Sequence, residues 1–208
     1  MAIQQQKTTT KGKQTQETIL NTAVKLASIE GLDGVTIGKL AAELSMSKSG
    51  LFGHFGSKEG LQLAIVESAK DTFVREVVTQ LRKLPAGIDK VSALGESWLT
   101  YMDNDIFPGG CFFLAVSHEF DNKPGNVRDA IAQYMQMWLS YIEHTIMKAQ
   151  NLGEIQPDVN PKQLAFELHS LYIGANWSKQ MLQDLDSTNR ARRAMRFLLD
   201  SVAVKLQK

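Results

Sequence analysis

The sequence predicts an all-α protein of about nine helices, with three short helices in its N-terminal quarter and a larger helical region after them. Apolar residues recur at intervals of three and four along most of the 208 residues, and no stretch alternates as a half-buried strand does. Serine, threonine, glycine and proline stand where these periodic stretches begin and end. The hydrophobic share of 43% is enough to build a buried core.

Helix boundaries follow from capping and breaking residues. The first four helices are expected at about residues 14–30, 36–44, 47–54 and 57–83. Gly31 ends the first of them, and the Ser45-Met46 pair forms a turn between the second and third. Thr36, Ser47 and Ser57 are each placed to cap the helix that follows.

Five more helices are expected after the break at Pro85 and Gly87. They lie at about residues 88–103, 110–120, 124–151, 161–183 and 188–206. The polar segment 1–13 is expected to be a flexible basic arm. We therefore divide the chain into this arm, a three-helix domain at 14–57 and a larger helical domain at 58–208.

Composition excludes several classes of protein. No apolar run approaches the roughly 20 residues that span a membrane, and the polar N-terminus does not resemble a secretory signal. Cys111 is the single cysteine, so no intrachain disulfide can form, which fits a cytoplasmic location. No nucleotide-binding loop, catalytic elbow or Cys/His metal pattern is present. We expect neither an enzyme nor a bound cofactor or metal.

Residues 36–63 read as a helix, a tight turn, a second short helix and the capped start of a long one. This is the pattern of a helix-turn-helix unit, whose second helix enters the DNA major groove. Lys48, Ser49 and His54 are the polar residues expected to face outward from that helix. Lys58 begins the next helix, where free N–H groups favour a phosphate, and Thr36 is placed for a similar contact. Residues 1–58 contain seven lysines and four acidic residues, against 16 basic and 18 acidic residues in the remainder.

The segments GLDGVTIGKLA, MSKSGLFGHF and SKEGL, in this order and spacing, resemble the N-terminal domain of TetR/AcrR-family regulators over residues 14–63. The resemblance implies an all-helical homodimer with a three-helix DNA-binding domain and a C-terminal ligand-binding domain. The DNA-contacting residues that it implies are Thr36, Ser47, Lys48, Ser49, Phe52, His54 and Lys58. Ser45 and Phe52 depart from the glycine and tyrosine common in the family. Gly50 and Gly53 lower the stability of the predicted recognition helix.

The last two predicted helices are apolar on more than one side, so each needs more than one packing partner. The resemblance implies that these helices pair with their copies in a dimer. Our candidate dimerisation residues are Leu164, Leu168, Leu171, Ala175, Met195, Leu198 and Val202. A second set of apolar residues lies on other sides of the two helices: Phe166, Ile173, Trp177, Ala194, Phe197 and Val204.

Large, adaptable side chains in the middle of the chain suit a ligand-binding cavity as well as an ordinary core. The candidate wall residues are Trp98, Met102, Phe112, Trp138 and Tyr172, and the candidate polar anchors are His118, His169 and Asn176. Cys111 follows two glycines at a predicted helix start, where a thiolate could be stabilised, and is a further candidate.

The sequence thus favours a transcriptional repressor that binds a palindromic operator as a dimer. A small, apolar or aromatic effector in the C-terminal domain would release it. Two alternatives stay open: a redox- or electrophile-responsive regulator acting through Cys111, and a helical small-molecule sensor acting through protein contacts alone.

Overall fold

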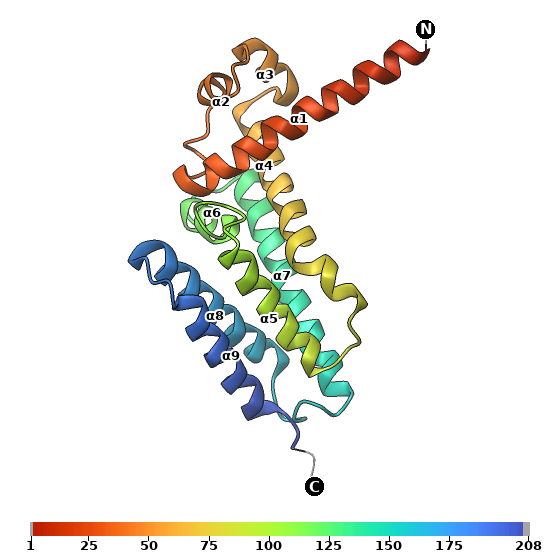
Figure 1. Ribbon diagram of the computed structural model, residues 1–208, viewed down its shortest axis with the longest axis vertical. Helices are drawn as coiled ribbons and strands as arrows, with labels where there is room; N and C mark the ends of the chain where they lie inside the picture. The colour runs from red at the N-terminus through yellow and green to blue at the C-terminus, as the bar shows by residue number, and fades with distance from the viewer. Residues whose placement is uncertain (1, 206–208) are drawn as a thin grey trace. The chain divides into compact units, whose positions relative to one another are not determined.

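The computed structural model describes residues 2–205 of the chain, with side chains from residue 12 onward. Nine α-helices make up most of this range: α1 (Ala2–Glu30), α2 (Ile37–Glu43), α3 (Lys48–Phe55), α4 (Lys58–Phe73), α5 (Ile88–Asp103), α6 (Phe112–Phe120), α7 (Asn126–Asn151), α8 (Pro161–Leu182) and α9 (Ser187–Val202) (Figure 1). The all-α prediction is confirmed. None of these helices is long and apolar enough to cross a membrane.

The chain forms two compact units, which do not follow the predicted division at residue 57. Unit 1 runs to Asp71 and also takes in Phe107–Ile131, whereas unit 2 comprises Thr72–Ile106 and Ala132–Lys208. The start of α4, α6 and the start of α7 therefore belong with the helix-turn-helix. Sequence periodicity could not show this, because the contacts responsible join residues far apart in the chain.

Unit 1 is built around a small core in which α1 packs on α2 and α6, and α2 packs on α3. Leu40 of α2, Leu51 of α3 and Leu61 of α4 are fully buried there. Helix α1 begins at Ala2, so the segment predicted as a flexible arm continues the helix backbone. A helix can run through it because it holds no proline and one glycine, Gly12, which destabilises a helix only by about 1 kcal/mol.

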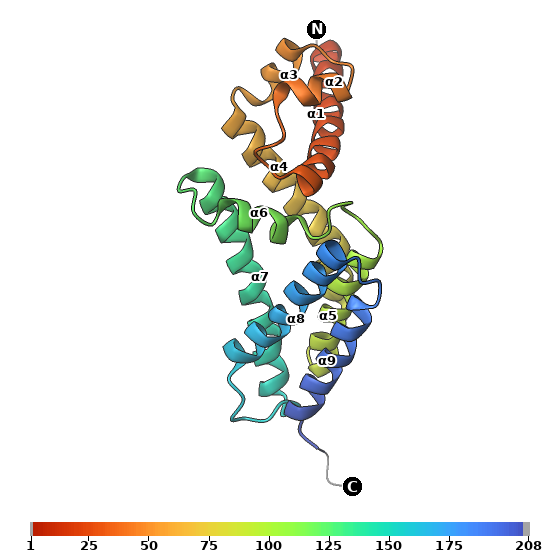
Figure 2. The same cartoon turned by 90° about the vertical axis from the view of Figure 1, so that its left-hand side faces the viewer.

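Unit 2 is a helical bundle in which α8 and α9 form an antiparallel pair that also packs on α5 (Figures 1 and 2). Asn160 caps α8 by accepting hydrogen bonds from the amides of Lys162 and Gln163. The chain leaves α8 through Gln183 in the left-handed conformation and enters α9 four residues later. This short connection keeps the two helices side by side.

The predicted helix at 57–83 changes its hydrogen-bond pattern beyond Phe73. A π-helical turn, Val74–Val78, and a 3₁₀ turn, Thr79–Lys83, follow the α-helical part. Ser97 of α5 donates a hydrogen bond to the carbonyl of Val77 and accepts one from Gln80 Nε2. These bonds satisfy polar groups that an irregular helix turn would otherwise leave buried and unpaired.

Candidate nucleic-acid interface

The turn between α2 and α3 is fixed by side-chain caps on both helices. Thr36 Oγ1 accepts a hydrogen bond from the Lys39 amide, and Ser47 Oγ accepts one from the Gly50 amide. Both caps agree with the sequence prediction. Ser45 occupies the turn at φ +51°, a left-handed conformation that glycine adopts without steric cost. This explains why a glycine is common there in the resembled family.

Helix α3 presents one apolar side chain to the core and leaves most of its surface exposed. Leu51 is fully buried, whereas Lys48 and Ser49 are exposed and His54 is half-buried. Phe52 is 50% exposed, although it is a large aromatic residue. The helix thus has the exposed polar and aromatic residues that contact base edges and phosphates in helix-turn-helix proteins.

Three of the predicted DNA-contacting residues lie close together at the start of α2. The Cε and Nζ atoms of Lys48 lie 3.5 and 3.8 Å from the point that a Cβ on Gly38 would occupy, and Thr36 Oγ1 lies 3.9 Å from it. Ser47, the cap of α3, directly precedes Lys48. An ammonium near an exposed hydroxyl can bind a phosphate oxygen.

Lys58 is held by a carboxylate that the sequence analysis missed. Its Nζ lies 3.0 Å from Asp33 Oδ1 in the loop between α1 and α2. Asp33 also accepts hydrogen bonds from Gln62 Nε2 at 2.8 Å and from Lys123 Nζ at 2.8 Å. The Lys123 ammonium, followed by that of Lys58, holds the pKa of Asp33 well below its usual range. The Lys58 side chain remains 53% exposed, so a phosphate contact would compete with this ion pair.

The same loop is bound from α6. The carboxylate of Glu119 accepts hydrogen bonds from the backbone amides of Leu32 and Asp33, at 2.6 and 2.8 Å. Gly31 lies against this carboxylate, and a Cβ there would come within 2.8 Å of Glu119 Oε2. Together these contacts fix the loop that leads into α2.

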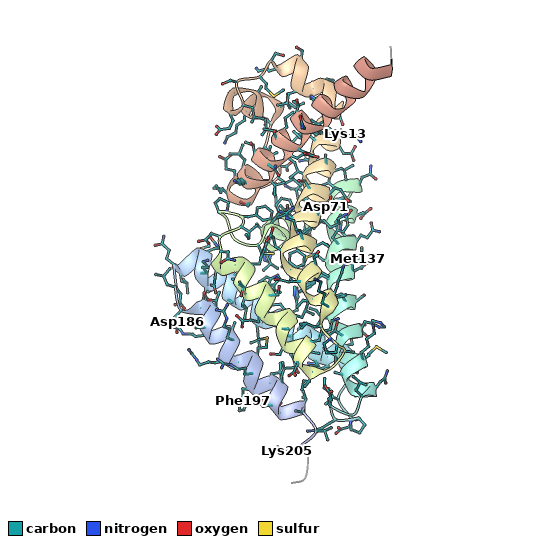
Figure 3. The ribbon with its side chains drawn as sticks, turned by 45° about the vertical axis from the view of Figure 1, so that its right-hand side comes forward. Lys13, Asp71, Met137, Asp186, Phe197 and Lys205 are labelled. Carbon is teal, nitrogen blue, oxygen red and sulfur yellow. The ribbon has the colours of Figure 1, made fainter. Side chains whose placement is uncertain are left out.

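Four of the predicted dimerisation residues are buried within one subunit. Leu164, Leu168, Ala175 and Met195 are at most 5% exposed, so they offer little surface to a second chain. Leu171, Leu198 and Val202 are half-buried. The exposed apolar residues lie on the other face: Phe166, Ile173, Trp177, Met181 and Phe197. Figure 3 labels Phe197 on α9.

The candidate ligand-binding residues divide between the two units. Cys111, Phe112 and His118 belong to unit 1, where Phe112 is fully buried and His118 is exposed. The remaining candidates belong to unit 2: Trp98, Met102, Trp138, His169, Tyr172 and Asn176. All of these are buried except Asn176, which is half-buried. The unit 2 set is therefore the stronger candidate for an effector site.

Cys111 does not have the environment of a reactive thiol. It is 3% exposed, and burial raises the pKa of its thiol to about 11. At neutral pH the residue is therefore the protonated thiol, which is a poor nucleophile. Burial and this pKa do not favour the redox-responsive alternative.

Comparison with known proteins agrees with this architecture. Residues 19–65 match the family described as bacterial regulatory proteins, tetR family, and residues 87–195 match the tetracyclin repressor-like C-terminal domain. Among curated proteins none matches the chain.

Solved structures with the same fold include three that are informative here. A TetR transcriptional regulator from Chloroflexus aurantiacus has a TM-score of 0.86 and 23% identity, over 93% of this chain and 98% of that one. A putative transcriptional regulator from Saccharomonospora viridis, in complex with choline, has a TM-score of 0.76 and 24% identity, over 93% and 100%. AibR, in complex with isovaleryl coenzyme A and operator DNA, has a TM-score of 0.68 and 21% identity, over 90% and 97%.

The two matched segments together cover most of the chain, and they fall on the helix-turn-helix and on the helical region that follows it. The chain therefore belongs to the TetR family of DNA-binding transcriptional regulators.

Proposed function

We propose that this protein is a cytoplasmic repressor that binds a palindromic operator as a homodimer and leaves it when a small molecule binds unit 2. The observation that carries the proposal is the pair of exposed surfaces on one chain. One surface, on α2 and α3, is polar and cationic, and the other, on α8 and α9, is apolar. The first suits DNA and the second suits a copy of the same chain.

DNA binding is supported by the surface of α3. Lys48 and Ser49 stand in the first turn of this helix, which is the part that meets base edges in a helix-turn-helix. Lys48 Nζ and the Thr36 hydroxyl gather beside Gly38, where they suit a backbone phosphate. Lys58 would supply a further phosphate contact once it leaves Asp33.

Dimerisation is supported by an exposed stripe on α8, formed by Phe166, Ile173, Trp177 and Met181. These residues follow one another at intervals of seven, four and four, so they share one face of the helix. Their exposed fractions are 64%, 37%, 54% and 67%. Phe197 on the neighbouring α9 is 79% exposed. An apolar stripe of this length on a soluble chain calls for a partner, and a second α8–α9 pair would complete a four-helix interface.

An effector site in unit 2 is supported by buried polar side-chain atoms without hydrogen-bond partners and by relatives of the same fold. One structural neighbour binds choline and another binds isovaleryl coenzyme A. Because these two bound molecules differ so widely in chemistry, neither identifies the effector of this chain. Helices α4 and α7 are each continuous across the boundary between the units, so a shift in either helix can carry the effector signal.

The variant Lys48→Ala tests whether α3 is the recognition helix. We expect operator affinity, measured by fluorescence anisotropy on DNA upstream of the protein's own gene, to fall about tenfold because a cationic contact is lost. The slope of log affinity against log salt should shrink by about two, one phosphate contact for each subunit. Unchanged affinity and slope would remove α3 from the interface.

Lys148→Ala serves as the matched control, because Lys148 is an exposed lysine on α7 in unit 2. It should leave both quantities unchanged. If the unmodified protein does not bind this DNA, the alternative function is favoured, which is a small-molecule sensor acting through protein contacts alone.

A further inference from the structure

Unit 2 contains buried polar side-chain atoms that have no hydrogen-bond partner. Among the described residues these are Trp138 Nε1, His169 Nδ1, Tyr172 Oη and Ser187 Oγ. All four residues belong to unit 2 and are at most 9% exposed. A buried polar group without a partner costs about 1–3 kcal/mol, so four in one bundle are unusual.

Three of these residues belong to one group of rings, which we call the aromatic band: Phe73, Trp98, Tyr101, Trp138, His169 and Tyr172. Phe73 meets Trp138 edge-on at 4.9 Å and Tyr101 at 5.6 Å between ring centroids. Trp98 stacks on Tyr172 at 4.7 Å, and Tyr172 meets His169 at 6.3 Å. Trp98 and Tyr101 are three residues apart on α5, so both halves of the band include a ring from the same side of that helix.

The four unpartnered atoms do not constrain a ligand equally. Tyr172 Oη lies against α5 and α9. A Cβ on Gly95 of α5 would come within 2.8 Å of this oxygen and would also clash with Met195 Sδ of α9. The hydroxyl of Ser187 rotates freely and so constrains a partner less. The indole nitrogen of Trp138 is different, because it can only donate. Trp138 therefore requires an acceptor.

The same unit offers no buried charge to a ligand. Its buried polar side chains are all uncharged in the described residues: Ser97, Thr145, His169, Ser187 and Thr188. Burial lowers the pKa of His169 to about 4, so its imidazole is neutral at physiological pH. The half-buried cations are already held: Lys179 by Asp105, Arg192 by Glu96 and Asp103, and Lys90 by the carbonyl of Leu84. A strongly hydrated ion, such as a carboxylate or an amidinium, would lose its hydration there without gaining a buried counter-charge.

We propose that the effector is an uncharged, aromatic-sized molecule that carries a hydrogen-bond acceptor, and that it binds at the aromatic band with its acceptor on Trp138 Nε1. His169, on α8, supplies a second polar contact, as donor or acceptor according to its tautomer. This inference rests on the proposed function, since it names the effector class for the site in unit 2. It excludes carboxylates and other strongly hydrated ions as effectors.

Four planar compounds of matched size test the effector class on the full-length protein. They are acetophenone, which is neutral with an acceptor; benzoate, an anion; benzamidinium, a cation; and α-methylstyrene, which has no acceptor. The naphthyl homologue of each covers a larger size. Binding is measured as the rise in the unfolding temperature, which requires no DNA, and then as release from operator DNA.

The neutral ketones should bind most tightly and release the operator, the hydrocarbons should bind more weakly, and the ions should not bind. Trp138→Phe should weaken ketone binding roughly five- to tenfold and leave hydrocarbon binding unchanged. Tyr141→Phe is the control, because it removes a hydroxyl from the ring stacked on Trp138 and keeps the indole N–H.

Three results would overturn the inference. They are binding of either ion as tightly as the ketone, failure of both ketones to bind, and an unchanged ratio of ketone to hydrocarbon affinity in Trp138→Phe. The ranking on unmodified protein decides the question even if that variant does not fold. If the unmodified protein does not bind operator DNA in the absence of any compound, the proposed function is wrong. That result is distinct from the three that overturn the inference about the effector class.

Discussion

Helices α3 and α8 both expose surface that needs a partner, but they do so with opposite chemistry. Helix α3 has eight residues, buries Leu51 and exposes lysine and serine with one aromatic ring. Helix α8 has 22 residues, buries one apolar face in its own bundle and exposes a second apolar face. A polar surface can stay in water until it meets DNA, whereas an exposed apolar stripe favours permanent association. Under the proposed function, the contrast separates a reversible interface with DNA from an obligate interface between subunits.

The largest effect is expected on the exposed face of α8. In the double variant Phe166→Asp with Trp177→Asp, the dissociation constant of the dimer should rise about 1,000-fold or more, because two large apolar contacts become buried carboxylates. Sedimentation equilibrium measures the change, and operator affinity should fall with it. A variant that stays dimeric at micromolar concentration would place the interface elsewhere.

Met137→Asp is the matched control for that variant. Met137 is 57% exposed on α7, away from α8 and α9 in sequence (Figure 3). The substitution adds one carboxylate, against two in the double variant, at an apolar side chain of similar exposure. Dimerisation should not change, so a loss here would show that exposure alone does not identify the interface.

The buried face of α8 should make stability depend on pH through His169. Burial lowers the pKa of this side chain from 6.5 to about 4. Below pH 6.5 the unfolded chain takes up a proton that the folded chain does not, so the contribution is complete above pH 6.5 and is lost as the pH falls toward 4. The loss amounts to about 3 kcal/mol.

His169→Phe should remove this part of the pH dependence while keeping a ring of similar size. Urea unfolding of both proteins at pH 7 and pH 4.5, at equal concentration, measures it. As the pH falls from 7 to 4.5, the unfolding free energy of the unmodified protein should decrease by more than that of His169→Phe. Parallel curves for the two proteins would mean that His169 titrates normally in the folded state.

The smallest effect is expected on α3. A Cβ on Gly53 would meet no atom within 4 Å, so Gly53→Ala should raise the unfolding free energy by about 0.5–1 kcal/mol by favouring the helix. Gly56→Ala should do the opposite, since Gly56 ends the helix at φ +72°. Thermal unfolding of the two variants measures both effects. Equal shifts of the unfolding temperature in the same direction would show that backbone conformation at these two glycines does not govern stability.

Local features of the site could be predicted from the sequence. Thr36, Ser47 and Ser57 cap their helices as expected, because a cap bonds to an amide only three residues away in the chain. The exposed positions of Lys48 and Ser49 follow from the same short-range geometry. The Asp33 ion pairs could not be predicted, since Lys123 lies 90 residues away in the chain.

Periodicity showed that α8 carries two apolar stripes but not which one faces inward. The stripe that contains Leu164 and Leu168 was assigned to the dimer, and the structure buries it in the subunit. Both stripes have the same spacing and similar hydrophobicity, so only the packing of α5 and α9 decides between them. The chemistry of Cys111 was open for the same reason, because burial sets its pKa.

The sequence by itself determined the all-α class, the helix-turn-helix and its caps, because these depend on spacing and on bonds between near neighbours. The tertiary structure decided which apolar face is free, which lysine is already paired and which buried polar atoms lack partners. Each of these depends on what surrounds a side chain in space. In this protein those surroundings come from segments far apart along the chain.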